Sequence, residues 1–189
     1  MSKRIPSTKR PTAPPRSLYR KIQAVLAEVR KRPGRSRAAL VKQIAASGHL
    51  DFTRFKAGSG RSVEVVTCSD DSIGAVIDIC ENLKLVDSSS GELSAAGLRA
   101  AEPQNFDDVL RRSIGLALDS FGTPLSEIRK VIVDMLSECK RDTLPTCDTI
   151  YDRMGRPEGT RGLHFFRTHL SLLSACDGIA YTRKKLYLP

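Results

Sequence analysis

The chain has 189 residues and a formal net charge of +10, with 40% hydrophobic residues, 5% aromatic residues and no tryptophan. This length allows one large domain or two small ones with a buried core. No run of about 18 apolar residues occurs, which disfavours a membrane span, and the basic N-terminus lacks the apolar stretch of a secretory signal. The five cysteines form no close pairs, which favours a reducing compartment, cytoplasmic (nucleoid-associated) or nuclear, over a disulfide framework.

The positive charge is concentrated at the start of the chain. Residues 1–61 contain sixteen Lys and Arg but only two acids, a net charge of +14, so residues 62–189 carry −4. Such a density of cations indicates a polyanionic partner, usually a nucleic-acid backbone, or a large solvated surface. Residues 1–16 combine four prolines and five cations with no acid. We expect them to form a disordered basic arm that follows phosphates, or a solvated tail.

The first half then shows helical spacing. A stripe that includes Leu18, Ile22 and Val29 predicts a helix that Pro33-Gly34 ends, and a second helix follows and ends at Gly48. A Gly-Ser-Gly turn at 58–60 precedes alternating valines, which predict a strand at 62–67. A third helix is expected from about residue 72 to 83, a short hairpin at 85–94 and a helical exit at 95–101.

The second half repeats this plan. Apolar spacing predicts a helix with its stripe running from Phe106 to Phe121, and a second helix after the cap Thr123. The buried stripe of that second helix is expected to contain Leu125, Ile128, Ile132, Met135 and Leu136. Thr146 begins a short helix, Thr160 caps a further one, and a hairpin at 179–188 closes the chain with Arg183, Lys184 and Lys185 at its tip.

Both halves thus end in a helix that is followed at once by a small hairpin. Residues 77–93 (IDICENLKLVDSSSGEL) and residues 146–188 carry this pattern, which resembles the winged helix-turn-helix family. The resemblance implies a fold that is mainly α with small β-hairpin wings. It implies two tandem winged-helix domains, residues 17–102 and 103–189, after the disordered arm of residues 1–16. The family serves both DNA binding and protein contacts, so the fold alone does not settle the function.

The third helix of such a domain usually enters the major groove. In the second half the resemblance places Arg161, His164, Arg167 and His169 on that helix, with Arg156 before it. The first half departs from the pattern, because residues 62–102 carry a net charge of −6 that phosphates would repel. DNA contact there would come from the first two helices and the 54–61 loop. The acidic 62–102 surface is expected to bind a protein partner or the basic surface of a second copy, which leaves a homo-oligomer open.

The sequence therefore predicts a non-enzymatic protein that binds double-stranded DNA, as part of a larger DNA-handling complex. The alternative is a tandem winged-helix adaptor between proteins of a chromosome-organising or defence complex, and an RNA-associated protein is a third option. The residues expected to contact DNA are Lys3, Arg4, Lys9, Arg10, Arg16, Arg20, Arg30, Lys31, Arg32, Arg35, Arg37, Arg54, Lys56, Arg61, Arg156, Arg161, His164, Arg167, Arg183, Lys184 and Lys185.

No catalytic residue, cofactor or metal is expected. Glu138-Cys139-Lys140 has the E-x-K spacing of metal-dependent nucleases, but it ends an amphipathic helix where such enzymes use a strand. Cys139 and Cys147 lie too far apart for a zinc knuckle.

Overall fold

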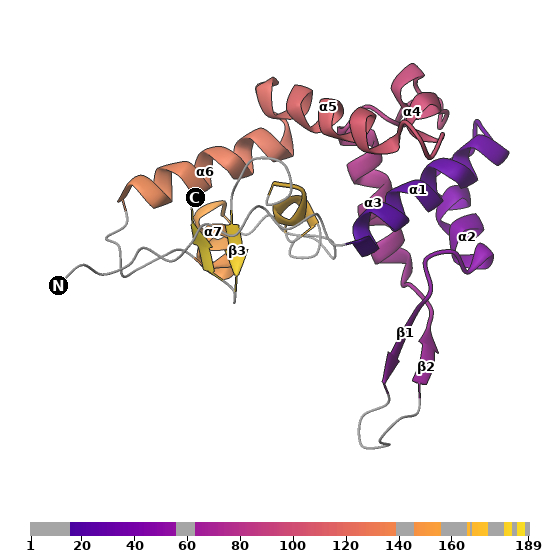
Figure 1. Cartoon of the computed structure of the whole chain (residues 1–189), viewed down its shortest axis with the longest axis horizontal. Coiled ribbons are helices and arrows are strands. Elements are labelled where there is room, and N and C mark those ends of the chain that lie inside the picture. The colour runs from indigo at the N-terminus through magenta and orange to yellow at the C-terminus, as the bar shows by residue number, and fades with distance from the viewer. Residues whose placement is uncertain are drawn as a thin grey trace.

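The computed structural model describes residues 16–55, 63–138, 146–155, 166, 168–173, 180–182 and 185–187. Over these residues the fold is mainly helical, as the sequence predicts, and it includes a pair of two-stranded antiparallel sheets (Figure 1). None of the helices in these ranges is both long and apolar enough to cross a bilayer.

The first two helices form where the hydrophobic spacing predicts them. In α1 (Arg16–Lys31) the predicted stripe, from Leu18 to Val29, is buried. In α2 (Arg37–Ser47) the N-cap Ser36 accepts a hydrogen bond at Oγ from the backbone N of Ala39, at 3.4 Å. Gly48 ends α2 with φ +66, a left-handed conformation that residues with a Cβ rarely adopt.

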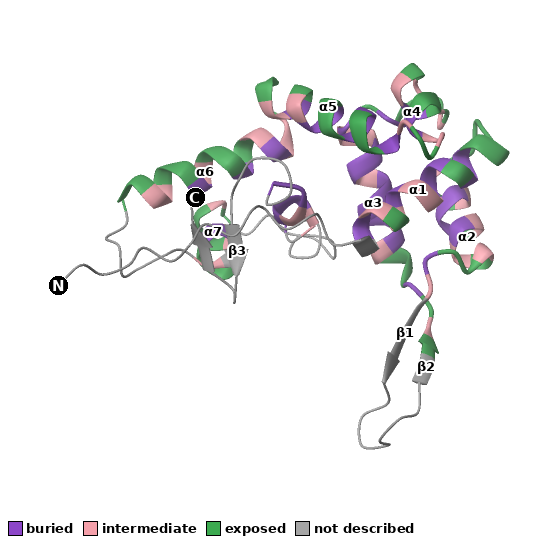
Figure 2. Ribbon diagram, in the orientation of Figure 1, coloured by how far each residue is buried: buried purple, intermediate pink, exposed green. Residues whose placement is uncertain are grey.

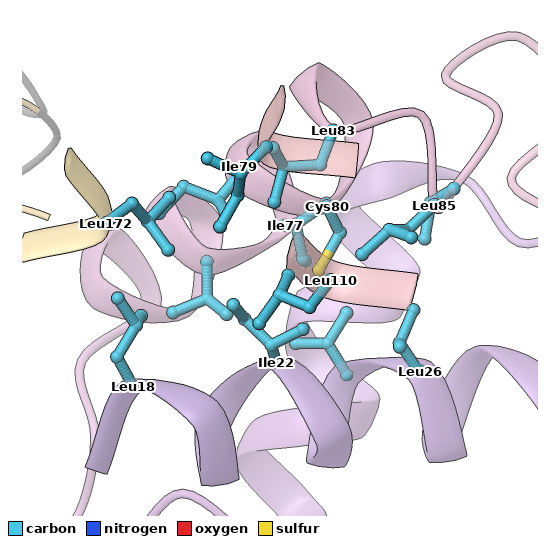
Figure 3. Close-up of a cluster of buried hydrophobic side chains, with 14 of the residues drawn as sticks. Leu18, Ile22, Leu26, Ile77, Ile79, Cys80, Leu83, Leu85, Leu110 and Leu172 are labelled. Carbon is cyan, nitrogen blue, oxygen red and sulfur yellow. The ribbon is translucent and has the colours of Figure 1, made fainter. Parts of the chain in front are cut away.

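The helix α3 (Asp70–Asn82) is the centre of the helical body. It packs against both α1 and α2, and seven of its thirteen residues are buried. Figure 3 shows the cluster around it, in which Ile22 of α1 points toward Ile77 and Cys80 of α3, while Leu18 lies at the other end of the cluster, toward Leu172. Burial raises the pKa of the Cys80 thiol, which makes it an unreactive core side chain.

A two-stranded ribbon separates α2 from α3. Its strands β1 (Phe52–Phe55) and β2 (Val63–Val66) are antiparallel, with Phe52 opposite Val66 and Phe55 opposite Val63. The strand expected at 62–67 is β2, whereas β1 was not predicted. Within the described chain neither strand packs extensively on a helix, and Figure 1 shows the ribbon standing away from the helical body.

The short hairpin expected at 85–94 is present in a minimal form, as a tight turn closed by one antiparallel bridge between Val86 and Leu93. Asp87 Oδ1 accepts hydrogen bonds from the backbone N of Ser89 and Ser90, at 2.8 and 3.0 Å. Hydrogen bonds from the Ser89 side chain and these two amides lower the pKa of Asp87 to about 2, so the turn keeps its anionic anchor in moderate acid. Helix α4 (Ala95–Ala100) follows.

The second half continues the same core. Phe106 at the start of α5 (Phe106–Asp119) meets Tyr19 of α1 edge to face, with ring centroids 5.4 Å apart. Figure 3 places Leu110 of α5 and Leu172 in this cluster too. Because buried side chains from both halves form one cluster, the domain division at residues 102 and 103 stays a prediction.

The remaining elements lie beyond α5. Thr123 Oγ1 accepts from the backbone N of Ser126, at 3.2 Å, where α6 (Pro124–Glu138) begins. Thr146 and Thr149 form a reciprocal capping box at α7 (Cys147–Arg153). Strands β3 (Ala180–Thr182) and β4 (Lys185–Tyr187) pair at the C-terminal end.

Three sequence-based expectations for the second half were wrong in detail. Phe121 is fully exposed instead of buried, because α5 ends at Asp119 and the turn after it no longer follows the helical stripe. Met135 and Leu136 pack against the core as expected but are only half-buried. Lys185 lies in β4 opposite Thr182, and not at the hairpin tip. The expected turn at 58–60 and the cap at Thr160 lie outside the described residues.

We expect Gly97→Ala to destabilise the protein by about 1–3 kcal/mol, because a Cβ at this position would collide with the backbone carbonyl of Leu85. A Cβ at Gly115 of α5 would meet nothing within 4 Å, so Gly115→Ala should instead stabilise the helix by about 0.5–1 kcal/mol. Urea unfolding at constant m-value measures both changes. Equal midpoints for the two variants would contradict this packing.

Candidate nucleic-acid interface

The β1–β2 ribbon is fixed to the helical body at its base. Leu50 before the ribbon and Cys68 after it are both buried. Asp51 Oδ1 accepts a hydrogen bond from the backbone N of Cys68, at 3.3 Å, which joins the incoming and outgoing chains. The base is therefore anchored by the burial of apolar side chains and by one hydrogen bond. Beyond the base, each strand is held mainly by its pairing with the other strand.

The ribbon combines basic residues with open apolar surface. Arg54 lies in β1 opposite Glu64 of β2, while Lys56 and Arg61 belong to the connection between the strands, outside the described residues. Val65 is 71% exposed, which is unusual for a valine in a strand. An isolated ribbon of two strands is only marginally stable in water, so this one is suited to being covered by a partner. Such a ribbon also has the width to enter a DNA major groove.

A second group of cations surrounds the connection between α1 and α2. Arg30, Arg32 and Arg35 are all exposed there. Lys31 is exposed as well, but its Nζ donates to Glu28 Oε1 at 2.8 Å. Three arginines at one turn thus remain open to an anionic partner, and no ion pair engages them within the described part of the chain.

Glu28 organises this connection from beneath. Its carboxylate is buried and accepts from Lys31 and, at 3.0 Å, from Gln43 Nε2 on α2, while His49 Nδ1 lies 3.2 Å away. The net effect of the surroundings is to lower the pKa of Glu28. Burial by itself would raise this pKa, but the hydrogen bonds from Lys31 and Gln43 and the charges of Lys31 and His49 outweigh the effect of burial. The ionised carboxylate therefore ties α1 to α2 and to the residues that follow it.

The two basic groups lie at opposite ends of α2. The arginines of the connection precede its first residue and the ribbon follows its last, and eleven helical residues extend over about 16 Å. Lys42 is exposed between them, and Arg20 is exposed on α1. The separation of the two groups therefore exceeds the width of one major groove, about 12 Å. A duplex that contacts both groups would be contacted at two separate places.

Arg37 does not belong to this open surface. Its guanidinium donates to Glu81 Oε2 and to the backbone O of Gly74, both at 2.9 Å, and also forms an ion pair with Asp78. Because the guanidinium of Arg37 is already paired with two carboxylates of α3, little of its charge remains for a phosphate. The expectation that Arg37 contacts DNA therefore has no support in this geometry, and the residue is instead a clamp between α2 and α3.

Helix α3 is unsuited to groove reading for a second reason besides its charge. Figure 2 shows that much of α3 is buried. The exposed residues of the helix are Asp70 and Asp71, at its start. A helix at the centre of a core cannot enter a groove without unfolding the body around it.

His169, which the resemblance places on the groove-reading helix, is completely buried. It lies in the segment 168–173, whose neighbours Leu170, Leu172 and Leu173 are also buried. Of the other candidates, Arg16 lies in α1 and Lys185 in β4. Those outside the described residues are Lys3, Arg4, Lys9, Arg10, Arg156, Arg161, His164, Arg167, Arg183 and Lys184.

Other kinds of site find little support in the described ranges. No group of three or more His, Cys, Asp or Glu is arranged there to hold a metal. A recess lies between Arg35 and the turn at 88–91, and its lining mixes serines with the charged Arg37 and Glu81 and the apolar Leu40 and Val86. No protein family, curated protein or solved structure shows significant similarity to the chain.

Arg35 and Arg37 offer a matched pair of substitutions. Arg37→Ala should lower the free energy of unfolding by about 1–3 kcal/mol, because Asp78 and Glu81 are partly buried and lose a shared partner. Arg35→Ala should change it by less than about 0.5 kcal/mol, because Arg35 is exposed. Thermal and urea unfolding test this, and similar losses for both variants would argue against the clamp.

Glu28→Gln should destabilise the protein at pH 7 by about 1–3 kcal/mol. Because folding lowers the pKa of Glu28, its stabilising effect is complete above about pH 4.5, the ordinary value, and disappears as the pH falls through the folded value. The difference between the variant and the parent protein should therefore shrink in acid. Glu92→Gln, at an exposed position outside the helices, is the matched control and should change the free energy of unfolding by less than about 0.5 kcal/mol. A Glu28→Gln deficit that stays constant from pH 7 to about pH 3 would exclude this role.

Proposed function

We propose that the protein binds double-stranded DNA without catalysing a reaction, as an accessory subunit of a larger DNA-handling complex. The observation that carries this proposal is the β1–β2 ribbon, which stands away from the helical body and has cationic residues in and beside its connection. In this proposal the ribbon enters a groove while the arginines of the α1–α2 connection bind phosphates further along the duplex.

The charges around the ribbon favour contact at its far end. Asp70 and Asp71 are exposed at the start of α3, only a few residues after β2. Phosphates would be repelled from the base of the ribbon, whereas Lys56 and Arg61 lie in the connection that is furthest from it along the chain. The basic segment 1–16 would add further phosphate contacts.

We also propose that the two halves are diverged winged-helix units. The bridge between Val86 and Leu93 after α3, and the β3–β4 hairpin after the segment 168–173, support this organisation. The ribbon between α2 and α3 departs from the family pattern. In this proposal the ribbon makes the groove contact that the buried, acidic α3 cannot make.

Salt dependence tests DNA binding directly. The slope of log affinity against log salt should fall by about 0.9 for every phosphate that the protein no longer neutralises, so Lys56→Ala with Arg61→Ala should reduce it by about 2 and weaken binding. The double variant Arg99→Ala with Lys130→Ala removes the same charge from exposed helical positions and is the control. Fluorescence anisotropy with a random duplex measures both.

Two results would contradict the proposal. One is an affinity that barely changes between about 50 and 200 mM salt, since several phosphate contacts should lower it by orders of magnitude. The other is an equal loss of affinity and of salt slope in the ribbon variant and the control variant. That result would mean that binding depends only on the net charge of the protein and not on the ribbon.

A protein-binding adaptor is the second candidate. Asp70, Asp71, Asp87 and Glu92 are exposed, and no ion pair engages them within the described residues, so they could meet a basic protein surface. A pull-down with and without nuclease separates the two functions, because partners held only through DNA disappear after digestion.

A further inference from the structure

The outward face of α5 carries an exposed stripe whose chemistry is complementary to itself. Arg112, Leu116 and Asp119 recur at intervals of four and three residues, which places them on one side of the helix. All three are exposed, and Leu116 is 69% exposed. Gly115 lies beside them, and the space over its Cα is open. The stripe thus combines a cation, an apolar knob, an open small residue and an anion.

From this stripe we infer that α5 binds the α5 of a second copy in antiparallel orientation, around a two-fold axis that passes between residues 115 and 116. In this register Arg112 faces Asp119 of the second copy, and the same pair repeats across the axis. Leu116 lies over Gly115 of the second copy. An isologous contact of this kind requires one surface to match itself, as this arrangement of charges does.

Two further observations favour a second copy as the occupant. Phe121 follows α5 and is completely exposed, so its apolar ring has no cover within the described chain. The axis brings it to the level of residues 110 and 111 on the other α5, where the exposed Arg111 can lie against the ring. Neither Arg112 nor Asp119 is engaged by an ion pair in the described part of the chain, so both are available. The contact is short, so we expect a dissociation constant on the order of micromolar.

Sedimentation velocity over a concentration series tests this inference. The parent protein should form a dimer, and Leu116→Asp should abolish it. Arg112→Asp and Asp119→Arg should each weaken dimerisation by roughly tenfold or more, because each places like charges opposite one another twice. The double variant with both changes should recover most of the affinity, because the pairs are restored with their signs exchanged. Circular dichroism confirms that each variant is folded.

Lys130→Asp, at an exposed position of α6, is the matched charge reversal and should leave dimerisation unchanged. A parent protein that stays monomeric at about 100 µM would overturn the inference. So would single variants that weaken a dimer when the double variant does not recover it. DNA binding is a separate measurement: a monomer that binds duplex refutes only the dimer, and a dimer that ignores duplex refutes only the proposed function.

Discussion

The arrangement of the protein depends on the burial of α3. This helix contributes Ile73, Ile77, Ile79 and Cys80 to a core that α1, α2 and α5 cover. Since the removal of apolar surface from water is the main favourable term in folding, the surrounding helices take their positions from it. Because most of α3 is buried and its exposed residues, Asp70 and Asp71, are acidic, the proposed contacts with a duplex fall on elements outside it, namely the ribbon and the α1–α2 connection.

The same constraint divides the cations of the first third into two classes. Arg37 is the residue of α2 that reaches the carboxylates of α3, and its charge is neutralised inside the protein by Asp78 and Glu81. Lys31 is held by the buried Glu28, which also contacts Gln43 and His49. Arg30, Arg32 and Arg35 remain exposed in and beside this connection. A net charge of +14 over residues 1–61 therefore overstates the charge that a polyanion would meet.

The proposed function and the proposed dimer use different surfaces of the protein. The ribbon follows the C-terminal end of α2, whereas the α5 stripe is separated from the ribbon along the chain by α3 and α4. A two-fold arrangement would present two ribbons to one duplex or to two. Avidity between linked sites would then raise the affinity without any new contact to DNA.

The sequence by itself determined the approximate positions of the described helices, because helical spacing, the Thr123 and Thr146 caps and Gly48 are local signals that need no distant partner. It also located β2 and the turn beside Val86. Only the tertiary structure showed that Phe52–Phe55 pairs with β2, since a four-residue strand has too weak a local signal without its partner. Tertiary packing likewise decided that Arg37 is a clamp, that His169 is buried and that Phe121 is exposed. Charge and periodicity describe which residues are present, but the fate of a charged or apolar side chain depends on the neighbours that folding brings to it from elsewhere in the chain.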